Sequence, residues 1–329
     1  MHLATTMRMQ RFALMATMAV LAGTDALVGA ARAADAPWLT DFAAAREQAA
    51  KDNKEILVNF TGSDWCGWCV TLEREVFSQA EFQDFAKSNL VLVKCDFPKN
   101  WQQIPEVVRN QNVALRRQYG LTSFPTIVLL DSKARPYAKT GYLKGGAPAY
   151  LKHLAELRTS IRDKRDAAWN KAKIASGVAK AQALADGLAT IDDDLVTRNY
   201  LTMVAEIQAL DPQDTTGIAK KNYAAKAKLV NLREAIKDTD RAAAFKLVDT
   251  YIADNKLNGV AAQEIQMLKL ERFNTSSAAD CDPVIKLMDE IIALDPASAL
   301  AGGATNVKNQ ATSQKKKLEQ DAAAKAGAK

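Results

Sequence analysis

The stretch Thr61-Gly62-Ser63-Asp64-Trp65-Cys66-Gly67-Trp68-Cys69-Val70 decides how this 329-residue chain is interpreted. It follows an apolar run at 56–60 and precedes a helical pattern, so we expect Cys66 in the first turn of a helix. Unpaired backbone NH groups and the positive end of the helix dipole favour a thiolate at that place. Cys69, one helical turn later, could then resolve a mixed disulfide formed by Cys66. The pair therefore predicts disulfide exchange.

Two other uses of a Cys-x-x-Cys pair stay open from the spacing alone. Structural zinc would need two further ligands. The chain offers only Cys95, Cys281 and two histidines, and His2 lies in a segment that we expect to be removed. An inert structural disulfide would need no further ligand. We expect neither a metal nor another cofactor.

Length and composition describe an ordinary globular protein. The chain is long enough for two domains, each with its own core, and 48% of its residues are hydrophobic while 25% are charged. The formal net charge is +6 at pH 7. That surplus is small, and no basic stretch interleaved with aromatic residues accompanies it, so the sequence predicts no nucleic acid partner.

Residues 1–33 have the pattern of a secretory signal peptide. A start containing two arginines is followed by the apolar stretch Phe12–Leu21, and Ala31-Arg32-Ala33 supplies small residues at a cleavage point. Asp25 interrupts the apolar stretch, which is too short to span a bilayer comfortably; an uncleaved anchor is the alternative. We therefore expect a periplasmic or secreted protein that is free of the membrane after cleavage, in a compartment where disulfides form.

Strands and helices alternate along residues 34–160. The hydrophobic pattern predicts helices at 38–52, from Gly67, and at 79–87, 107–119 and 147–160. It predicts strands at 56–60, 89–97, 125–131 and 137–143, the third beginning at a proline. This alternation predicts an α/β domain in which helices cover both faces of a central mixed sheet.

The order of these elements and two separate motifs resemble the thioredoxin-like family over about Trp38 to Ser160. The segment Trp65 to Cys69 is similar to the redox motif of that family, and Phe124-Pro125-Thr126 is similar to its cis-proline loop. The resemblance implies a thioredoxin-like fold with a cis bond before Pro125. A cis X-Pro bond is uncommon, and one retained in a fold usually has a geometric use.

The resemblance also implies roles for individual residues. Cys66 would be the catalytic nucleophile and Cys69 the resolving cysteine. Pro125 would lie against the two sulfurs, and the backbone of Phe124 would pair with a bound peptide. The side chains of Trp65 and Trp68 would form an apolar rim that binds substrate, or would instead pack against the motif helix.

Two departures from the family pattern bear on the chemistry. Asn59 stands where many thioredoxins have a buried aspartate that takes a proton from the resolving cysteine, and asparagine cannot act as that base. Water or Lys94 could move the proton instead. The pair Gly67-Trp68 replaces the Gly-Pro of reducing thioredoxins, which shifts the reduction potential and favours the isomerases. The reductase, oxidase and isomerase directions all stay open.

The remaining thiols and the second histidine are assigned no catalytic role. Cys95 lies in an apolar strand and is expected to be buried and inert. Cys281 precedes Asp282-Pro283 at a helix start, where we expect an exposed free thiol rather than a bond to Cys95. His153 is expected on the surface or in packing, because the mature chain has no second histidine for a Cys-His or Ser-His-Asp arrangement.

The chain beyond residue 160 is predicted to be all-α. The segment Glu206–Pro212 recurs as Glu290–Pro296, each ending in Asp-Pro, which we expect to begin the next helix. Such hairpins stack because one pair cannot bury its face alone, so residues 161–302 could form a repeat-like helical domain. It would carry a docking surface for a protein partner or would only stabilise the first domain. Residues 303–329, rich in Ala and Lys, would be a fraying helix or a disordered tail.

Together these features predict an exported thiol-disulfide oxidoreductase that acts on protein substrates with thiols or disulfides through Cys66 and Cys69. The alternative is a non-catalytic binding protein in which the thioredoxin fold is a scaffold and the helical domain docks a partner. A buried Cys66 and a reduction potential below about −300 mV would favour the alternative.

Overall fold

The computed structural model describes residues 36–273 and 275–327. The predicted signal peptide therefore lies outside the described residues. Within the described ranges, no helix is long and apolar enough to cross a membrane.

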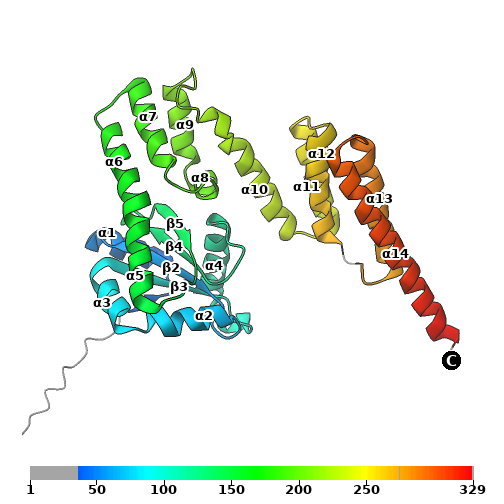
Figure 1. Ribbon diagram of the computed structural model, residues 1–329, viewed down its shortest axis with the longest axis horizontal. Coiled ribbons are helices and arrows are strands. Elements are labelled where there is room, and N and C mark those ends of the chain that lie inside the picture. The colour runs from blue at the N-terminus through cyan, green and yellow to red at the C-terminus, as the bar shows by residue number, and fades with distance from the viewer. Residues whose placement is uncertain (1–35, 274, 328–329) are drawn as a thin grey trace, which may run out of the picture. The chain divides into compact units, whose positions relative to one another are not determined.

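A five-stranded mixed sheet forms the centre of the first part of the chain (Figure 1). Its spatial order is β1-β3-β2-β4-β5. The pairs β1·β3 and β2·β3 are parallel, whereas β2·β4 and β4·β5 are antiparallel. The strands are β1 Trp38–Leu39, β2 Glu55–Thr61, β3 Leu90–Asp96, β4 Thr126–Leu130 and β5 Pro136–Thr140.

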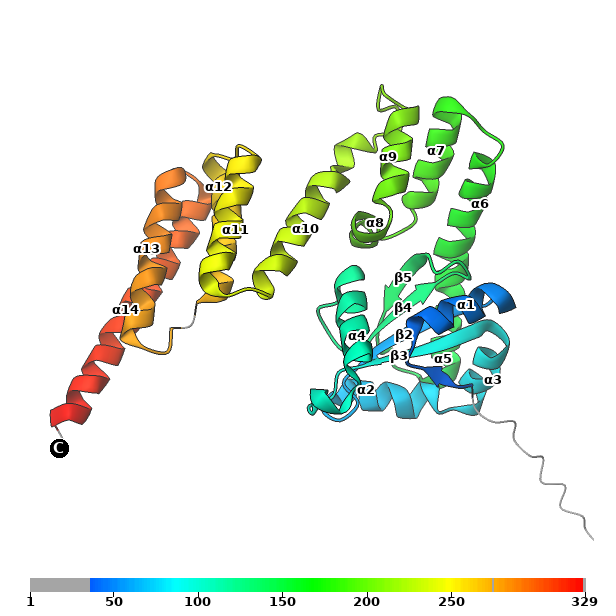
Figure 2. The same cartoon turned by 180° about the vertical axis from the view of Figure 1, so that it is seen from behind.

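Helices cover both faces of this sheet because β2 and β3 alternate their side chains between two apolar cores. Val58 and Phe60 lie in the core shared with α1 and α4, whereas Leu57 lies in the core shared with α2, α3 and α5. Helices α1 and α5 accordingly lie on opposite sides of the sheet (Figure 1 and Figure 2). The bounds are α1 Phe42–Asp52, α2 Gly67–Leu72, α3 Ala80–Asn89, α4 Glu106–Gln118 and α5 Gly146–Leu157, with a π-helical segment η1 Glu73–Phe77 after α2.

The thioredoxin-like fold predicted from the sequence is thus confirmed, with corrections at element ends. Trp38–Leu39 is a strand and not the start of a helix, because these residues pair with Leu92 and Val93 of β3. The helix begins only after Asp41, whose carboxylate accepts from the NH groups of two residues in the first turn of α1. Strand β5 ends at Thr140.

The chain continues from α5 without a loop, through a π-helical segment η3 Arg158–Arg162, into α6 Asp163–Ala172. Three further helices follow: α7 Gly177–Leu188, α8 Asp193–Asn199 and α9 Leu201–Leu210. Trp169 of α6, Leu184 of α7 and Val196 of α8 are buried in the same core as Val58 and Phe60 of β2. These helices therefore pack onto the sheet.

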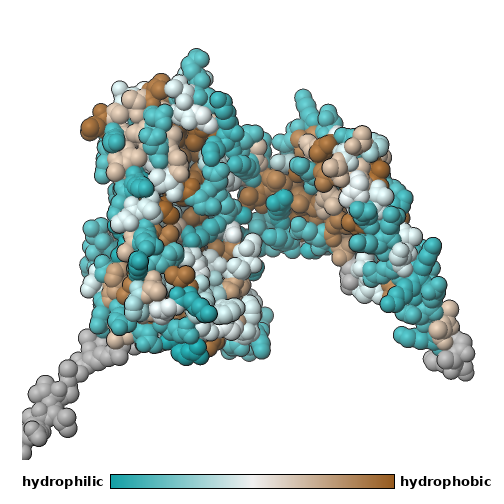
Figure 3. Space-filling view, in the orientation of Figure 1, coloured by the Kyte–Doolittle hydropathy of each residue, from teal (hydrophilic) through white to brown (hydrophobic). Residues whose placement is uncertain are grey.

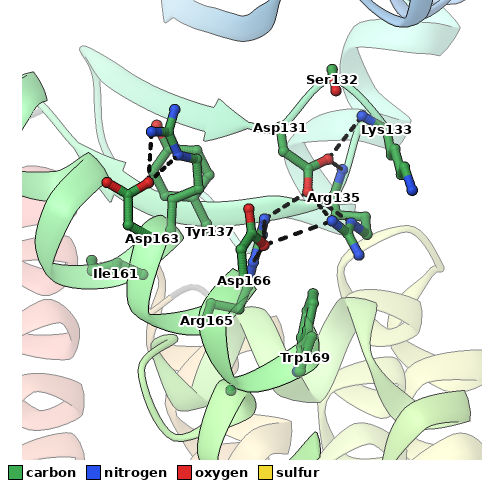
Figure 4. A network of polar contacts seen from close by, with 12 residues as sticks. Asp131, Ser132, Lys133, Arg135, Tyr137, Ile161, Asp163, Arg165, Asp166 and Trp169 are labelled. Atoms are coloured by element: carbon green, nitrogen blue, oxygen red, sulfur yellow. Dashed lines mark hydrogen bonds and ion pairs between the residues drawn. The ribbon is translucent and has the colours of Figure 1, made fainter. Parts of the chain in front are cut away.

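A network of charges with Asp131 and Arg165 buried at its centre also joins α6 to the sheet (Figure 4). Asp131, which follows β4, accepts hydrogen bonds from Arg135 at 2.7 Å and from Arg165 of α6 at 2.6 Å. The Arg165 guanidinium also contacts Asp166 and lies over the ring of Trp169. An arginine that is 0% exposed is stable only with such partners.

The rest of the described chain is helical, as predicted. Its helices are α10 Tyr223–Lys237, α11 Arg241–Asp254, α12 Gly259–Gln266, α13 Ala278–Leu294 and α14 Ala299–Gly327. Two small cores, one around Val248 of α11 and one around Met288 of α13, hold them together. The C-terminal part of α14 is largely hydrophilic on the face seen in Figure 3. The domain boundary at residue 160 and the repeat-like character of this region stay predictions.

One local prediction for this region is wrong. Asp211 and Asp295 do not begin helices; they are the C-terminal caps of α9 and α13, and turns follow them. The side chain of Asp211 accepts from the NH of Thr216 in the turn, at 2.7 Å. Proline after each aspartate therefore stops a helix here, because its ring cannot continue the helical hydrogen-bond ladder.

Candidate active site

Cys66 and Cys69 form a disulfide at the start of α2, with their Cα atoms 5.2 Å apart. Cys66 is the N-cap of this helix, and its carbonyl oxygen accepts from the NH groups of Cys69 and Val70. The NH of Cys69 also points at the Cys66 sulfur, with N and Sγ 3.2 Å apart. Once the disulfide is reduced, a donor in this position would stabilise negative charge on the Cys66 sulfur; the thiolate itself stays a prediction. The pair is shielded, with Cys66 only 7% exposed.

The loop before Cys66 is held by the end of β3. Ser63 donates from its backbone NH and its hydroxyl to the carboxylate of Asp96, at 3.0 and 2.6 Å. The indole NH of Trp65 donates to the carbonyl of Phe97 at 2.7 Å. Gly62 lies directly under this indole, where an added Cβ would be 2.3 Å from the ring. The glycine is therefore required for the position of Trp65.

The peptide bond between Phe124 and Pro125 is cis, as the resemblance implied. We call residues 120–125 the cis-proline loop. Trp65 meets Phe124 edge to face with ring centroids 5.6 Å apart. The residue before the first cysteine thus contacts the residue before the proline, which brings the loop to the motif.

Two further aromatic rings join this contact. Phe97 packs against Phe124 at 5.2 Å, and Trp101 stacks on Phe97 at 5.0 Å. The guanidinium of Arg116 lies over the rings of Phe97 and Phe124. The order of elements predicted the position of Phe124, but nothing in the sequence indicated that Phe97, Trp101 and Arg116 would join it.

Trp68, between the two cysteines in the sequence, is 61% exposed. Its ring stacks on Tyr142 with centroids 5.1 Å apart. The hydroxyl of Tyr142 donates to Glu75 at 2.7 Å, and this bond lowers the pKa of Glu75 while it raises the pKa of Tyr142. Trp65 is likewise 47% exposed. Both tryptophans therefore pack on a neighbouring ring and still present apolar surface; their role in binding substrate stays a prediction.

A cavity of about 490 Å³ lies beside Cys69, and Glu73 and Lys94 are among the residues that line it. The Lys94 ammonium and the Glu73 carboxylate are 3.6 Å apart. Asn59 pairs with Lys94 across β2 and β3 and is buried, and no hydrogen bond reaches its side-chain oxygen. Lys94 thus lines the cavity next to Cys69, whose proton the sequence suggested it could move. Glu73 was missed, although its spacing of one helical turn from Cys69 is a signal that could have found it.

The other cysteines are free and buried. Burial raises the pKa of the Cys95 thiol to about 12, which fits the inert thiol predicted there. The expectation that Cys281 is exposed is wrong. Ser277 and Asp280 form a capping box that begins α13 before Cys281, and the thiol then faces the helical core. His153 packs near Tyr150, and its Nε2 is 2.8 Å from the Thr140 hydroxyl.

Within the part of the chain that the structure describes, no set of metal ligands accompanies the cysteine pair. In residues 36–273 and 275–327, no group of three or more His, Cys, Asp or Glu side chains could hold a metal ion. In this oxidised form the two sulfurs are bonded to each other. The arrangement can therefore accept two electrons at the disulfide and, once reduced, can return them to another disulfide.

Comparison with known proteins agrees with this geometry. Residues 37–132 match the thioredoxin-like family model. The chain is 39% identical over 119 residues to the disulfide bond reductase DsbH of Chlamydia pneumoniae, a match that covers 36% of this chain and 70% of that protein. It is 30% identical over 104 residues to the thioredoxin-related protein DsbJ of the same organism, covering 32% of this chain and 30% of DsbJ.

Solved structures also show similarity to part of the chain. A DsbH oxidoreductase has 33% sequence identity and a TM-score of 0.36, covering 43% of this chain and 94% of that one. A thioredoxin from Thermus thermophilus has 18% identity and a TM-score of 0.30, covering 38% and 88%. On the sequence match to DsbH and the Cys66–Cys69 disulfide, this chain belongs to the thioredoxin-like family as a thiol-disulfide oxidoreductase related to DsbH.

Proposed function

We propose that this protein is exported and reduces disulfides in protein substrates through its Cys66-Gly67-Trp68-Cys69 motif. The observation that carries the proposal is the Cys66–Cys69 disulfide at the head of α2, where the adjacent Trp65 packs on Phe124 of the cis-proline loop. The reducing direction is supported by the relative DsbH, which is described as a disulfide bond reductase.

The first step is attack on a substrate disulfide. With the protein in its dithiol form, the Cys66 thiolate attacks one sulfur of the substrate, a bond forms between them, and the substrate disulfide breaks. The released substrate sulfur leaves as a thiolate and takes up a proton. The NH of Cys69, 3.2 Å from the Cys66 sulfur, favours the thiolate that starts this step.

The second step releases the substrate. Cys69 loses its proton and attacks the Cys66 sulfur, so that the mixed disulfide breaks and the second substrate thiol leaves. The substrate gains two electrons and the protein returns to the Cys66–Cys69 disulfide. Glu73 and Lys94 line the cavity beside Cys69 and supply groups that accept and return its proton. An external dithiol must then reduce the protein again.

The substrate surface in this proposal consists of Trp65, Trp68 and the backbone of Phe124. The two tryptophans adjoin the cysteines in the sequence and present exposed apolar rings, which suits unfolded or loop segments of a protein around a cystine. Phe124 contributes backbone groups for pairing with an extended chain.

Export rests on residues 1–33 alone, whose basic start, apolar stretch and small residues have the order of a signal peptide. The test is to express the full chain with a C-terminal tag in a bacterium that exports proteins, and to sequence the N-terminus of the mature product. A periplasmic product that begins near Ala34 supports export. An unprocessed product in the cytoplasm contradicts it.

One observation favours a second candidate function. Cys66 is only 7% exposed in the disulfide form, as in a scaffold whose disulfide never turns over. The reductase and the binding protein are expected to differ in the reduction potential of the Cys66–Cys69 pair and in whether the protein reduces disulfides catalytically. A potential above about −300 mV, together with catalytic reduction of insulin by a dithiol, supports the reductase. A lower potential without turnover supports a binding protein.

A further inference from the structure

We propose that helix α8 is a positioning element for the redox site, which it acts on through the cis-proline loop. This proposal rests on the proposed function, because it takes the loop as the surface that pairs with substrate. It assigns to residues of the helical region a part in substrate binding, although they contact neither cysteine.

The first residue of the loop lies against two charged side chains of α8. Gly120 has a φ of +65°, in the left-handed region. A Cβ on it would be 2.4 Å from Nε of Arg198 and 2.5 Å from Oδ2 of Asp194. A side chain at this position would therefore have to displace the charged pair as well as strain the backbone. The glycine allows α8 to rest on the loop backbone.

These side chains bind the end of α4, the helix that leads into the loop. The Asp194 carboxylate accepts from Nε of Arg198 and from Nζ of Lys139, both at 2.7 Å. Arg198 also donates to the carbonyl of Arg117 at 2.9 Å, and Lys139 donates to the carbonyl of Tyr119 at 3.3 Å. Asp194 thus orients two cations that donate to carbonyl groups at the C-terminus of α4, where the Arg117 carbonyl also accepts from the NH of Gly120.

Lys139 connects the same cluster to the strand that follows the loop. It lies on β5 opposite Val128 of β4, the strand that begins directly after Pro125. Gly141, just beyond β5, approaches the carbonyl oxygen of Pro125, which an added Cβ would meet at 3.1 Å. The cluster therefore contacts the first residue of the cis-proline loop directly, and Lys139 lies shortly before Gly141, which approaches the last residue of the loop.

The environment of Asp194 shows that its charged form holds the cluster. Burial raises the pKa of this carboxyl, but the hydrogen bonds from Lys139 and Arg198 outweigh burial and leave the pKa below its ordinary value. Neutralising the carboxylate would free both cations to move and would loosen the carbonyl groups that they hold. A small displacement of a binding surface is enough to weaken binding without unfolding the protein.

Asp193 supplies a matched control on the same helix. Its carboxylate accepts from the Tyr223 hydroxyl at 2.7 Å and lies near Lys226 and Lys221. None of these groups belongs to the cis-proline loop. Asp193→Asn thus removes the same charge from the neighbouring position of α8 without touching the Asp194 cluster.

The test compares the full-length wild type, Asp194→Asn and Asp193→Asn. Steady-state kcat and KM are measured for a disulfide-bonded peptide and for a small dialkyl disulfide, together with the reduction potential and the thermal midpoint. We expect Asp194→Asn to raise KM for the peptide by about 3- to 10-fold, corresponding to ~1 kcal/mol of lost binding. Its kcat, its kinetics with the small disulfide and its potential should stay within about twofold of the wild type. Asp193→Asn should leave peptide KM unchanged.

Gly120→Ala is a second variant in case Asp194→Asn is poorly folded, and we expect the same selective rise in peptide KM. An unchanged peptide KM in a folded variant, or a change in potential and in small-disulfide kinetics of the same size, would overturn the positioning role while leaving the reductase proposal intact. A wild type that turns over neither substrate would overturn both.

Discussion

Arg165 of α6 donates from Nη2 to Oδ2 of Asp131, 2.6 Å away, where β4 has just ended. The arginine side chain is completely buried, and its guanidinium also lies over the ring of Trp169 (Figure 4). The Arg165–Asp131 pair is therefore a buried contact that holds α6 against the sheet. A buried charge of this kind is costly to leave without its partner.

We predict that Arg165→Met lowers the free energy of unfolding by about 3 kcal/mol, because the buried Asp131 loses its enclosed cationic partner. It keeps the partly exposed Arg135 side chain and the backbone NH groups of Lys133 and Arg135. Urea unfolding followed by circular dichroism measures the change. Lys286→Met, which breaks an exposed pair with Glu290, is the control and should cost less than about 0.5 kcal/mol. Equal losses of unfolding free energy in the two variants would show that the buried pair stabilises the fold no more than an exposed ion pair does.

A second prediction concerns the reactivity of the four thiols. At about pH 8 a thiol with a pKa of about 12 is ionised in roughly one molecule in ten thousand, so Cys95 should not react with iodoacetamide in the folded protein. Cys281 is equally buried and should also be protected. In the reduced protein Cys66 should react first, as mass spectrometry of peptides from a timed reaction would show. Rapid labelling of Cys95 or Cys281 without denaturant would contradict this.

The fold and the motif were predictable because their signals are local. The Cys66–Cys69 spacing after an apolar strand and the proline before another strand are short patterns whose geometry follows from a few neighbouring residues. The alternation of strand and helix likewise follows from hydrophobic periods within single segments.

The features that were missed depend on distant pairing. Trp38–Leu39 forms a strand only because β3 lies beside it. A segment of two residues is too short to show the alternating hydrophobic pattern that predicts a strand. Arg165 has the sequence context of an exposed helical charge, since its partner Asp131 lies in another element. The contact of Asp194 and Arg198 with Gly120 joins segments far apart in the chain, so no local pattern could indicate it.

A third prediction tests the exposed ring beside the disulfide. Trp68→Ala should raise KM for a disulfide-bonded peptide about 5- to 10-fold, because an aromatic contact contributes about 1 kcal/mol. Tyr142→Phe is the matched control. It keeps the ring under Trp68 and removes only the hydrogen bond to Glu75, so KM should stay within about twofold. If Tyr142→Phe had as large an effect as Trp68→Ala, the hydroxyl rather than the apolar ring would matter.

A fourth prediction follows from the close approach of Gly62 to Trp65. Gly62→Ala should push the indole from its place and break its 2.7 Å hydrogen bond to Phe97. We expect a red-shifted tryptophan emission and a loss of stability of about 1–3 kcal/mol from overpacking. The control is Gly302→Ala in α14, where an added Cβ meets nothing within 4 Å and stability should stay the same or rise. An unchanged emission spectrum in Gly62→Ala would refute the packing argument.

The central claim is that Cys66 is the sulfur that attacks substrate. The most direct measurement is the rate of insulin disulfide reduction by Cys66→Ser compared with the wild type, with thermal unfolding of both proteins under reducing conditions. We predict a loss of activity of at least about 100-fold with an unchanged unfolding midpoint, because serine keeps the shape of the N-cap and removes the nucleophile. Insulin reduction at the wild-type rate by Cys66→Ser would contradict the claim.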